Sequence, residues 1–167
     1  MKIIRSICSP HYNERKKTIR MLVLHATATG TLDETFSYLI DSVAPNRVSA
    51  HYVIDRNGQI YQLVPDEKRA WHAGISWWPD MGDDINDVSI GIEFQCPEKN
   101  GQLGGFTKKQ IKSGTFLCRY LCDRYQIAPK NVVGHSDIAP DRKKDPGKQF
   151  PWEIFVMAGL SDNKERR

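Results

Sequence analysis

A continuous apolar run, Met21-Leu22-Val23-Leu24, limits the possible folds of this chain more than any other feature. Successive residues of a strand point to opposite faces, so a strand that is apolar at every position must be covered on both sides. We therefore expect a central strand at residues 20–25, inside a sheet with helices on its faces. A second strand is predicted at residues 88–95, where apolar residues alternate with small or polar ones.

The remaining elements are predicted from turn and cap signals. Asn57-Gly58 separates residues 51–56 from residues 59–64 and predicts a hairpin. Residues 71–87 are rich in Trp, Gly, Pro and Asp and indicate a long loop. A short strand is expected at residues 131–135. Helices are predicted after a capping box at residues 31–34, ending at Pro45, after a second box at residues 107–110, and after Pro151.

Strands and helices alternate without a regular βαβ rhythm, which indicates an α/β (α+β) fold with a mixed central sheet flanked by helices. The 167 residues suit one domain. We expect a polar, irregular N-terminal arm at residues 1–19, the domain itself at residues 20–160, and a charged C-terminal tail at residues 161–167.

Composition excludes several classes of protein. The net charge of +4 is mild, and its local runs, such as Arg15-Lys16-Lys17 and Arg142-Lys143-Lys144, are typical of solvated faces. No nucleic-acid motif, membrane span or signal peptide is visible, so we expect a cytoplasmic protein as encoded, or a periplasmic one if a leader was removed. The four cysteines form no CxxC pair, and Cys118 and Cys122 are expected on the face of a helix that packs into the core.

Two histidines and one aspartate carry the main chemical signal. His25 and His135 each end a predicted strand, and Asp145 stands before Pro146-Gly147, a pair that can turn the chain back towards the strand ends. Two imidazoles and a carboxylate are a three-ligand zinc set that leaves the fourth position open, as in catalytic sites. The spacing alone is weak evidence, because single histidines are more often structural and no short HxxxH-type element is present.

Glu93 and Lys143 are candidates for catalysis. Glu93 lies on the polar face of residues 88–95 beside Ser89 and Gly91, where small neighbours leave room for water or substrate. Zinc lowers the pKa of water, and a carboxylate within reach can take the proton. Lys143 could stabilise an oxyanion. The alternatives are a surface glutamate on an edge strand and a solvated lysine.

Six segments occur in one order between residues 21 and 152 and together resemble the type-2 N-acetylmuramoyl-L-alanine amidases, which include the peptidoglycan-recognition proteins. The likeness is greatest to bacterial members of the AmpD and AmiD kind. The segments are Leu22-Val23-Leu24-His25-Ala26-Thr27, Ser49-Ala50-His51-Tyr52-Val53-Ile54, Gln62-Leu63-Val64-Pro65, Ala70-Trp71-His72-Ala73-Gly74, Asn86-Asp87-Val88-Ser89-Ile90-Gly91-Ile92-Glu93, and Val133-Gly134-His135-Ser136-Asp137, the last running on through Asp145 to Trp152.

This resemblance implies one catalytic Zn²⁺ held by His25, His135 and Asp145, with Glu93 as catalytic carboxylate and Lys143 as transition-state stabiliser. It implies hydrolysis of the amide between N-acetylmuramic acid, or its 1,6-anhydro form, and L-alanine. The expected partners are peptidoglycan fragments or muropeptides; no nucleic acid, membrane span or oligomer is required. Residues in matching motifs are candidates for substrate binding: His51, Trp71, His72 and Asn86, with the Trp77-Trp78 pair as possible groove walls or loop anchors.

Two other readings stay open. Some relatives recognise peptidoglycan without cutting it, and the loss of a zinc ligand would mark that non-catalytic class. A zinc-stabilised interaction domain would instead need a fourth protein ligand, such as His51 or Cys96, near the metal.

Overall fold

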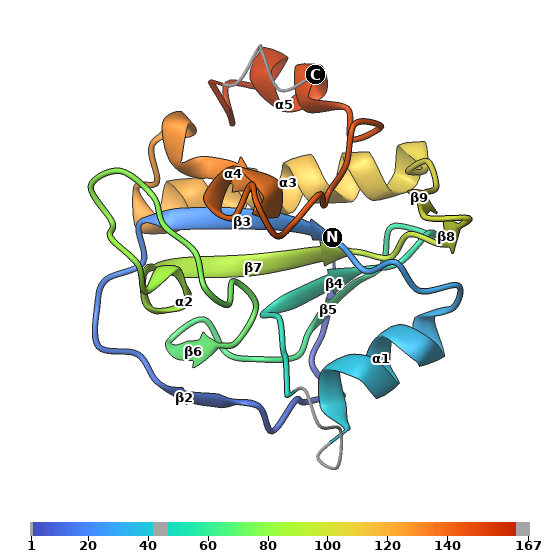
Figure 1. Ribbon diagram of the computed structural model, residues 1–167, viewed down its shortest axis with the longest axis horizontal. Coiled ribbons are helices and arrows are strands. Elements are labelled where there is room, and N and C mark those ends of the chain that lie inside the picture. Colours follow the sequence, from blue (N-terminus) through green and yellow to red (C-terminus); the bar gives the residue numbers. More distant parts are fainter. Residues whose placement is uncertain (1, 42–46, 163–167) are drawn as a thin grey trace.

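The computed structural model describes residues 2–41 and 47–162. Its core is a six-stranded mixed sheet in the order β1-β5-β4-β7-β3-β10 (Figure 1). Only β4 and β5 pair in antiparallel fashion within this sheet; β1 with β5, β4 with β7, β7 with β3, and β3 with β10 are parallel. The strand bounds are Ile3–Ile4 for β1, Met21–Ala26 for β3, Tyr52–Ile54 for β4, Ile60–Gln62 for β5, Ser89–Phe94 for β7 and Val132–Gly134 for β10.

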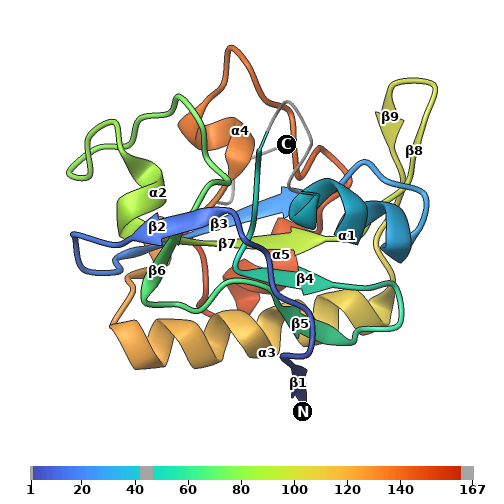
Figure 2. The same cartoon turned by 90° about the horizontal axis from the view of Figure 1, so that it is seen from below.

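Helices cover both faces of the sheet (Figure 2). The long helix α3 (Lys108–Tyr125) and the short α5 (Trp152–Met157) pack on one face, and α1 (Leu32–Ile40), α2 (Ile85–Val88) and α4 (His135–Ile138) lie on the other. A 3₁₀ turn (Pro129–Asn131) precedes β10. The expected single α+β domain with a mixed sheet is therefore confirmed.

The apolar run of β3 is buried on both sides, as predicted. Its four apolar residues are fully inaccessible to solvent. Leu22 and Leu24 pack into the large core beneath α3 and α5, whereas Met21 and Val23 pack into a smaller cluster with residues of α2 and α4. Burial of such side chains contributes about 1.5–3 kcal/mol each. The same alternation places His25 on the α2 and α4 face of the sheet.

Strand β7 lies between β4 and β3, so it is a central strand and not an edge strand. Ile90, Ile92 and Phe94 face the large core, as their alternation predicts. Val88 differs, because it ends α2 and packs in the smaller cluster. The residues between them face α2 and α4 together with His25.

Both predicted capping boxes are formed, by Thr31 with Glu34 and by Thr107 with Gln110. The first helix ends at Ile40, and Pro45 lies outside the described residues. The hairpin of β4 and β5 is present, but its turn spans residues 55–59 and is closed by the side chain of Asp55, whose Oδ1 accepts from two backbone N–H groups. Cys118 and Cys122 lie in the large core, as expected.

Two short strands lie within residues 2–19, which corrects the expectation that this arm is irregular throughout. Besides β1, the strand β2 (Tyr12–Glu14) pairs with β6 (Lys68–Ala70) in a separate two-stranded sheet. A further pair, β8 (Glu98–Lys99) and β9 (Gln102–Leu103), projects beside the large sheet. Strands of two or three residues are too short to leave a periodic signal in the sequence.

Two more boundaries differ from expectation. His135 does not end a strand but opens α4, and residues 85–88, expected within a loop, form α2. Within the part of the chain that the structure describes, no helix combines the length and the apolar composition that crossing a bilayer requires.

Candidate metal centre and active site

The three candidate ligands meet at the carboxyl ends of the parallel strands. His25 is the fifth residue of β3, and His135 follows directly after β10. Asp145 comes from the loop beyond α4, and its backbone carbonyl accepts a 2.9 Å hydrogen bond from Ser136 N–H, which holds that loop against the first turn of α4. Sites in open sheets are commonly built at this edge, because several strands end there side by side.

The ligand atoms form a tight triangle. His25 Nδ1 lies 3.0 Å from His135 Nδ1 and 3.1 Å from Asp145 Oδ2, and His135 Nδ1 lies 3.2 Å from the same carboxylate oxygen. Among the described residues this is the group that could hold a metal ion. Burial and the neighbouring His135 lower the pKa of His25 to about 4, so its imidazole is neutral at pH 7. Burial alone would raise the pKa of Asp145, but the two imidazoles beside it outweigh burial and hold that pKa well below its ordinary value.

The donor set fits zinc. The remote nitrogens are engaged elsewhere, His25 Nε2 with His72 Nδ1 at 3.1 Å and His135 Nε2 with the Ala73 carbonyl at 3.0 Å. A carbonyl only accepts, so His135 Nε2 carries the hydrogen and Nδ1 keeps its lone pair. Neutral imidazole nitrogens and a carboxylate converging on one point are ligands that zinc prefers.

A closed four-ligand site finds no support in the described residues. His51 Nδ1 accepts from Gly91 N–H, and its Nε2 lies 3.0 Å from the Lys68 carbonyl. Cys96 Sγ contacts the Gly104 carbonyl. Neither belongs to the group of ligand atoms, so the arrangement has the three protein ligands of an open, catalytic type of site.

Glu93 lies in the same pocket, a cavity of about 330 Å³ lined also by the three candidate ligands. It is the β7 partner of His25 in the strand register. Its Oε2 is buried and has no hydrogen-bond partner within residues 2–41 and 47–162. Burial, with help from the charge of Asp145, raises the pKa of Glu93 to about 8. An unsatisfied buried carboxyl with a shifted pKa, next to a candidate metal position, is typical of a proton-transfer group.

Lys143 lines this pocket and also a neighbouring hollow of about 690 Å³. Its positive charge makes a smaller contribution that lowers the pKa of both His25 and Glu93. In Glu93 this contribution opposes the larger effect of burial. Lys143 therefore lies near the reacting centre, where a cation can act on a developing negative charge.

The predicted substrate-binding residues fall into different places. His72 lines the pocket but is buried between His25 and Ser89. His51 is fully buried beneath it. Asn86 points its Oδ1 at backbone N–H groups, and Trp71 stacks on His11, so neither lines the pocket. Their roles in substrate binding stay predictions.

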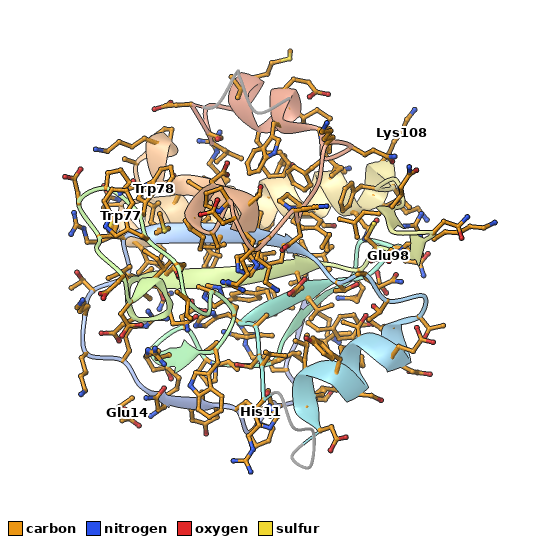
Figure 3. The ribbon with its side chains drawn as sticks, viewed as in Figure 1. His11, Glu14, Trp77, Trp78, Glu98 and Lys108 are labelled. Atoms are coloured by element: carbon orange, nitrogen blue, oxygen red, sulfur yellow. The ribbon has the colours of Figure 1, made fainter. Side chains whose placement is uncertain are left out.

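The Trp77-Trp78 pair lies at the side of the molecule opposite Glu98, which belongs to the pocket wall (Figure 3). Trp78 packs against the smaller core, and its indole N–H points to Asn131 Oδ1 at 3.4 Å. Trp77 is 60% exposed. These contacts favour loop anchoring for Trp78 over a place in the groove wall.

Two arginines beside the site are not evident from the sequence. Arg15 belongs to a basic run that is typical of a solvated face, but its guanidinium contacts His51 Nε2 and five backbone carbonyls, those of Asp66, Lys68, Asn86, Asp87 and Ser89. Arg142 donates to the carbonyls of Ala73 and Ile75. A basic run gives no sign of which member turns inwards, so the sequence alone could not have found them.

Comparison with known proteins identifies the relatives of this chain. The family model described as N-acetylmuramoyl-L-alanine amidase matches residues 15–148. The 1,6-anhydro-N-acetylmuramyl-L-alanine amidase AmpD of Escherichia coli K12 is 39% identical, over 90% of this chain and 89% of that protein. A crystal structure of an AmpD selenomethionine derivative superposes with a TM-score of 0.79 at 34% identity, covering 93% of both chains.

A second solved structure contains a substrate. It is the Escherichia coli amidase AmiD in complex with anhydro-N-acetylmuramic acid-L-Ala-D-γ-Glu-L-Lys, with a TM-score of 0.75 and 39% identity over 86% of this chain. The present chain spans 58% of that longer protein. Matches of this extent and identity show common descent as well as a common fold. The chain belongs to the N-acetylmuramoyl-L-alanine amidase family.

Proposed function

We propose that this chain is a zinc amidase that hydrolyses the bond between the lactyl group of 1,6-anhydro-N-acetylmuramic acid and the L-alanine of the stem peptide. The observation that carries the proposal is the triangle of His25, His135 and Asp145, with its ligand atoms 3.0–3.2 Å apart and Glu93 in the same pocket. Intact peptidoglycan is a second possible substrate of the same site.

His25, His135 and Asp145 would hold the metal. A zinc ion there would act as a Lewis acid towards the scissile carbonyl and would make water acidic enough to lose a proton near neutral pH. The chain itself supplies ligand positions that are already aligned, because the backbone hydrogen bond from Ser136 N–H to the Asp145 carbonyl fixes the loop ligand against α4. Preformed ligand positions reduce the entropy cost of assembling the site.

Glu93 is proposed to move the proton. Its Oε2 faces no protein donor among the described residues. The positive charge of a zinc ion beside it would lower the raised pKa of Glu93, so that the carboxylate could accept a proton from water and deliver one to the leaving amine of L-alanine. Lys143 is proposed to stabilise the negative charge that develops on the carbonyl oxygen. Its side chain lines both hollows, and one of them is also lined by the three candidate ligands and Glu93.

The anhydro form is proposed because of the relatives. AmpD matches nearly the whole length of this chain and is named for the 1,6-anhydro substrate, and the AmiD complex contains an anhydro-muropeptide. Substrate choice is tested by offering the zinc-loaded protein anhydro-muropeptides and intact sacculi in parallel, and identifying the products by mass. The expected products are the free sugar acid and a peptide with an amino-terminal L-alanine. Cleavage between sugars, or no cleavage at all, would refute the proposal.

A non-catalytic recognition module is the alternative, and the complete ligand set speaks against it. Cleavage between sugars also has little support. Glycosidases use two carboxylates on either side of the bond, and the aspartates of the loop are placed elsewhere: Asp84 pairs with Arg69 and Asp80 with Lys130.

A further inference from the structure

The two candidate histidine ligands are contacted by the same short segment at their ring nitrogens remote from the metal position. His25 Nε2 meets the Nδ1 of His72, and His135 Nε2 meets the backbone carbonyl of Ala73. Residues 72 and 73 are adjacent, so one dipeptide provides an acceptor for the remote nitrogen of each ligand. Such partners decide which ring nitrogen of a metal-binding histidine carries the hydrogen.

The direction of each hydrogen bond can be worked out from the end of the hydrogen-bonded series that is farthest from the metal position. The Ser89 hydroxyl donates its only hydrogen to the Ile85 carbonyl, at 2.5 Å. Towards His72 Nε2, 3.2 Å away, Ser89 Oγ can therefore only accept. His72 then carries its hydrogen on Nε2 and offers the lone pair of Nδ1 to His25.

The same logic reaches the metal position. Because His72 Nδ1 accepts, His25 donates from Nε2 and keeps a lone pair on Nδ1, the atom that faces His135 and Asp145. The Ala73 carbonyl fixes His135 in the same form. Each of these two series of hydrogen bonds, called relays below, ends on a backbone carbonyl, which can only accept a hydrogen bond. Both ligand rings are therefore held in the tautomer that a metal requires.

Two further residues hold the dipeptide in place. Asn86 Oδ1 accepts from the backbone N–H groups of both His72 and Ala73, at 2.9 and 2.8 Å. Gly91 lies under the His72 ring, where a Cβ would stand 2.4 Å from His72 Cγ. The space beside Gly91 is thus filled by an imidazole, and not by water or substrate as its small neighbours suggested.

We propose that His72 and Asn86 are positioning residues: the 72–73 dipeptide, clamped by Asn86, sets the Nε2–H tautomer of His25 and His135 before any metal binds. This inference rests on the proposed metal site, but it concerns hydrogen bonds within the chain. It gives His72 and Asn86 a function different from the substrate contact that their motifs implied.

The direct test is nitrogen-15 NMR of the full chain labelled at histidine, first loaded with zinc and then after zinc removal. Histidine 15N shifts distinguish a protonated ring nitrogen from one with a free lone pair. We expect His25, His72 and His135 to carry hydrogen on Nε2 in the zinc-free protein. An Nδ1–H form of His25 or His135 as the major species would overturn the proposal, and this measurement needs no variant.

The second test is zinc affinity, measured by competition with a chelator and not by activity. His72→Leu removes the acceptor, and we expect the dissociation constant for zinc to rise by about 10- to 100-fold, the usual effect of losing a hydrogen-bond partner of a metal-binding histidine. His72→Asn keeps an acceptor near the position of Nδ1 and should restore most of the affinity. Asn86→Ala should weaken zinc binding as well, since both relays lose their clamp.

His11→Leu is the matched control, because His11 is also a buried histidine but contacts Trp71 and Val48, not the ligands. Its zinc affinity should equal that of the unmodified protein. Folded His72→Leu protein with unchanged affinity would contradict the proposal. A chain that binds no zinc at all would refute the proposed function instead, while the zinc-free tautomers would still decide the role of His72.

Discussion

His51 gives a prediction about acid stability that can be worked out from its contacts. The residue is fully buried, its Nδ1 accepts from Gly91 N–H, and its Nε2 lies 3.0 Å from both the Lys68 carbonyl and Arg15 Nη2. A second proton would break the bond with Gly91 and place a positive charge beside Arg15. Burial, followed by the charge of Arg15, accordingly lowers the pKa of His51 to about 3.

The sign of the effect follows from proton linkage. In the unfolded chain the pKa of a histidine is about 6.5, so below that pH the unfolded state takes up a proton that the folded state refuses. The stabilisation is complete above pH 6.5 and is lost as the pH falls towards 3. At about 1.4 kcal/mol per pH unit, His51 alone should cost the folded state about 2 kcal/mol between pH 6.5 and pH 5.

The assay compares the unmodified protein with His51→Asn by urea unfolding from pH 7.5 to pH 5, with chelator present so that zinc binding does not contribute. Other buried histidines titrate in both proteins and cancel in the difference. The variant should be less stable at pH 7.5, and its deficit should shrink by about 2 kcal/mol at pH 5. A deficit that stays constant over this range would show that His51 does not titrate as its environment predicts.

Other predictions concern the reacting centre. Chelation should abolish activity and zinc should restore it, and His25→Ala should lose the metal, as checked by zinc content; a stoichiometric zinc in that variant would refute the ligand assignment. Glu93→Gln should keep zinc but lose roughly two to four orders of magnitude in kcat, because the amide cannot accept a proton. Lys143→Ala should lower kcat by roughly two to three orders of magnitude with a smaller change in KM; near-normal kcat in either variant would exclude its proposed role.

The sheet and its caps could be predicted from the sequence because their signals are local. The burial of Met21-Leu22-Val23-Leu24 follows from its own apolar residues. The capping boxes at Thr31 and Thr107 start helices through hydrogen bonds between residues only three positions apart. The ligand triangle is harder to predict, since His25 and Asp145 are 120 residues apart. Their spacing is weak evidence that they meet, and the resemblance to a family is what strengthens it.

What the sequence could not predict depends on tertiary contacts. Ser89 and Gly91 are small residues and predict free space beside Glu93, but the ring of His72, from a different segment, fills that space. Arg15 likewise belongs to a basic run by composition, but its guanidinium donates to five backbone carbonyls in the interior. No periodicity encodes which side chain of a neighbouring segment will occupy a gap on a strand.

A last prediction compares the two faces of the sheet at β7. On each face, a glycine lies in close contact with an aromatic ring. A Cβ at Gly91 would stand 2.4 Å from the His72 ring, and a Cβ at Gly114 of α3 would stand 2.6 Å from the Phe94 ring on the opposite face. Overpacking of this kind typically costs about 1–3 kcal/mol. Gly91→Ala and Gly114→Ala should therefore lose comparable stability in urea unfolding without zinc.

Their zinc affinities should nevertheless differ. Gly91→Ala should push the His72 ring away from His25 Nε2, so zinc should bind more weakly by about 10- to 100-fold, as expected when a ligand histidine loses its hydrogen-bond partner. Gly114→Ala disturbs only the large core and should bind zinc normally. If both variants lost zinc affinity in proportion to their stability, the metal site would depend on the general rigidity of the sheet, and the specific place of His72 beside Gly91 would not explain it.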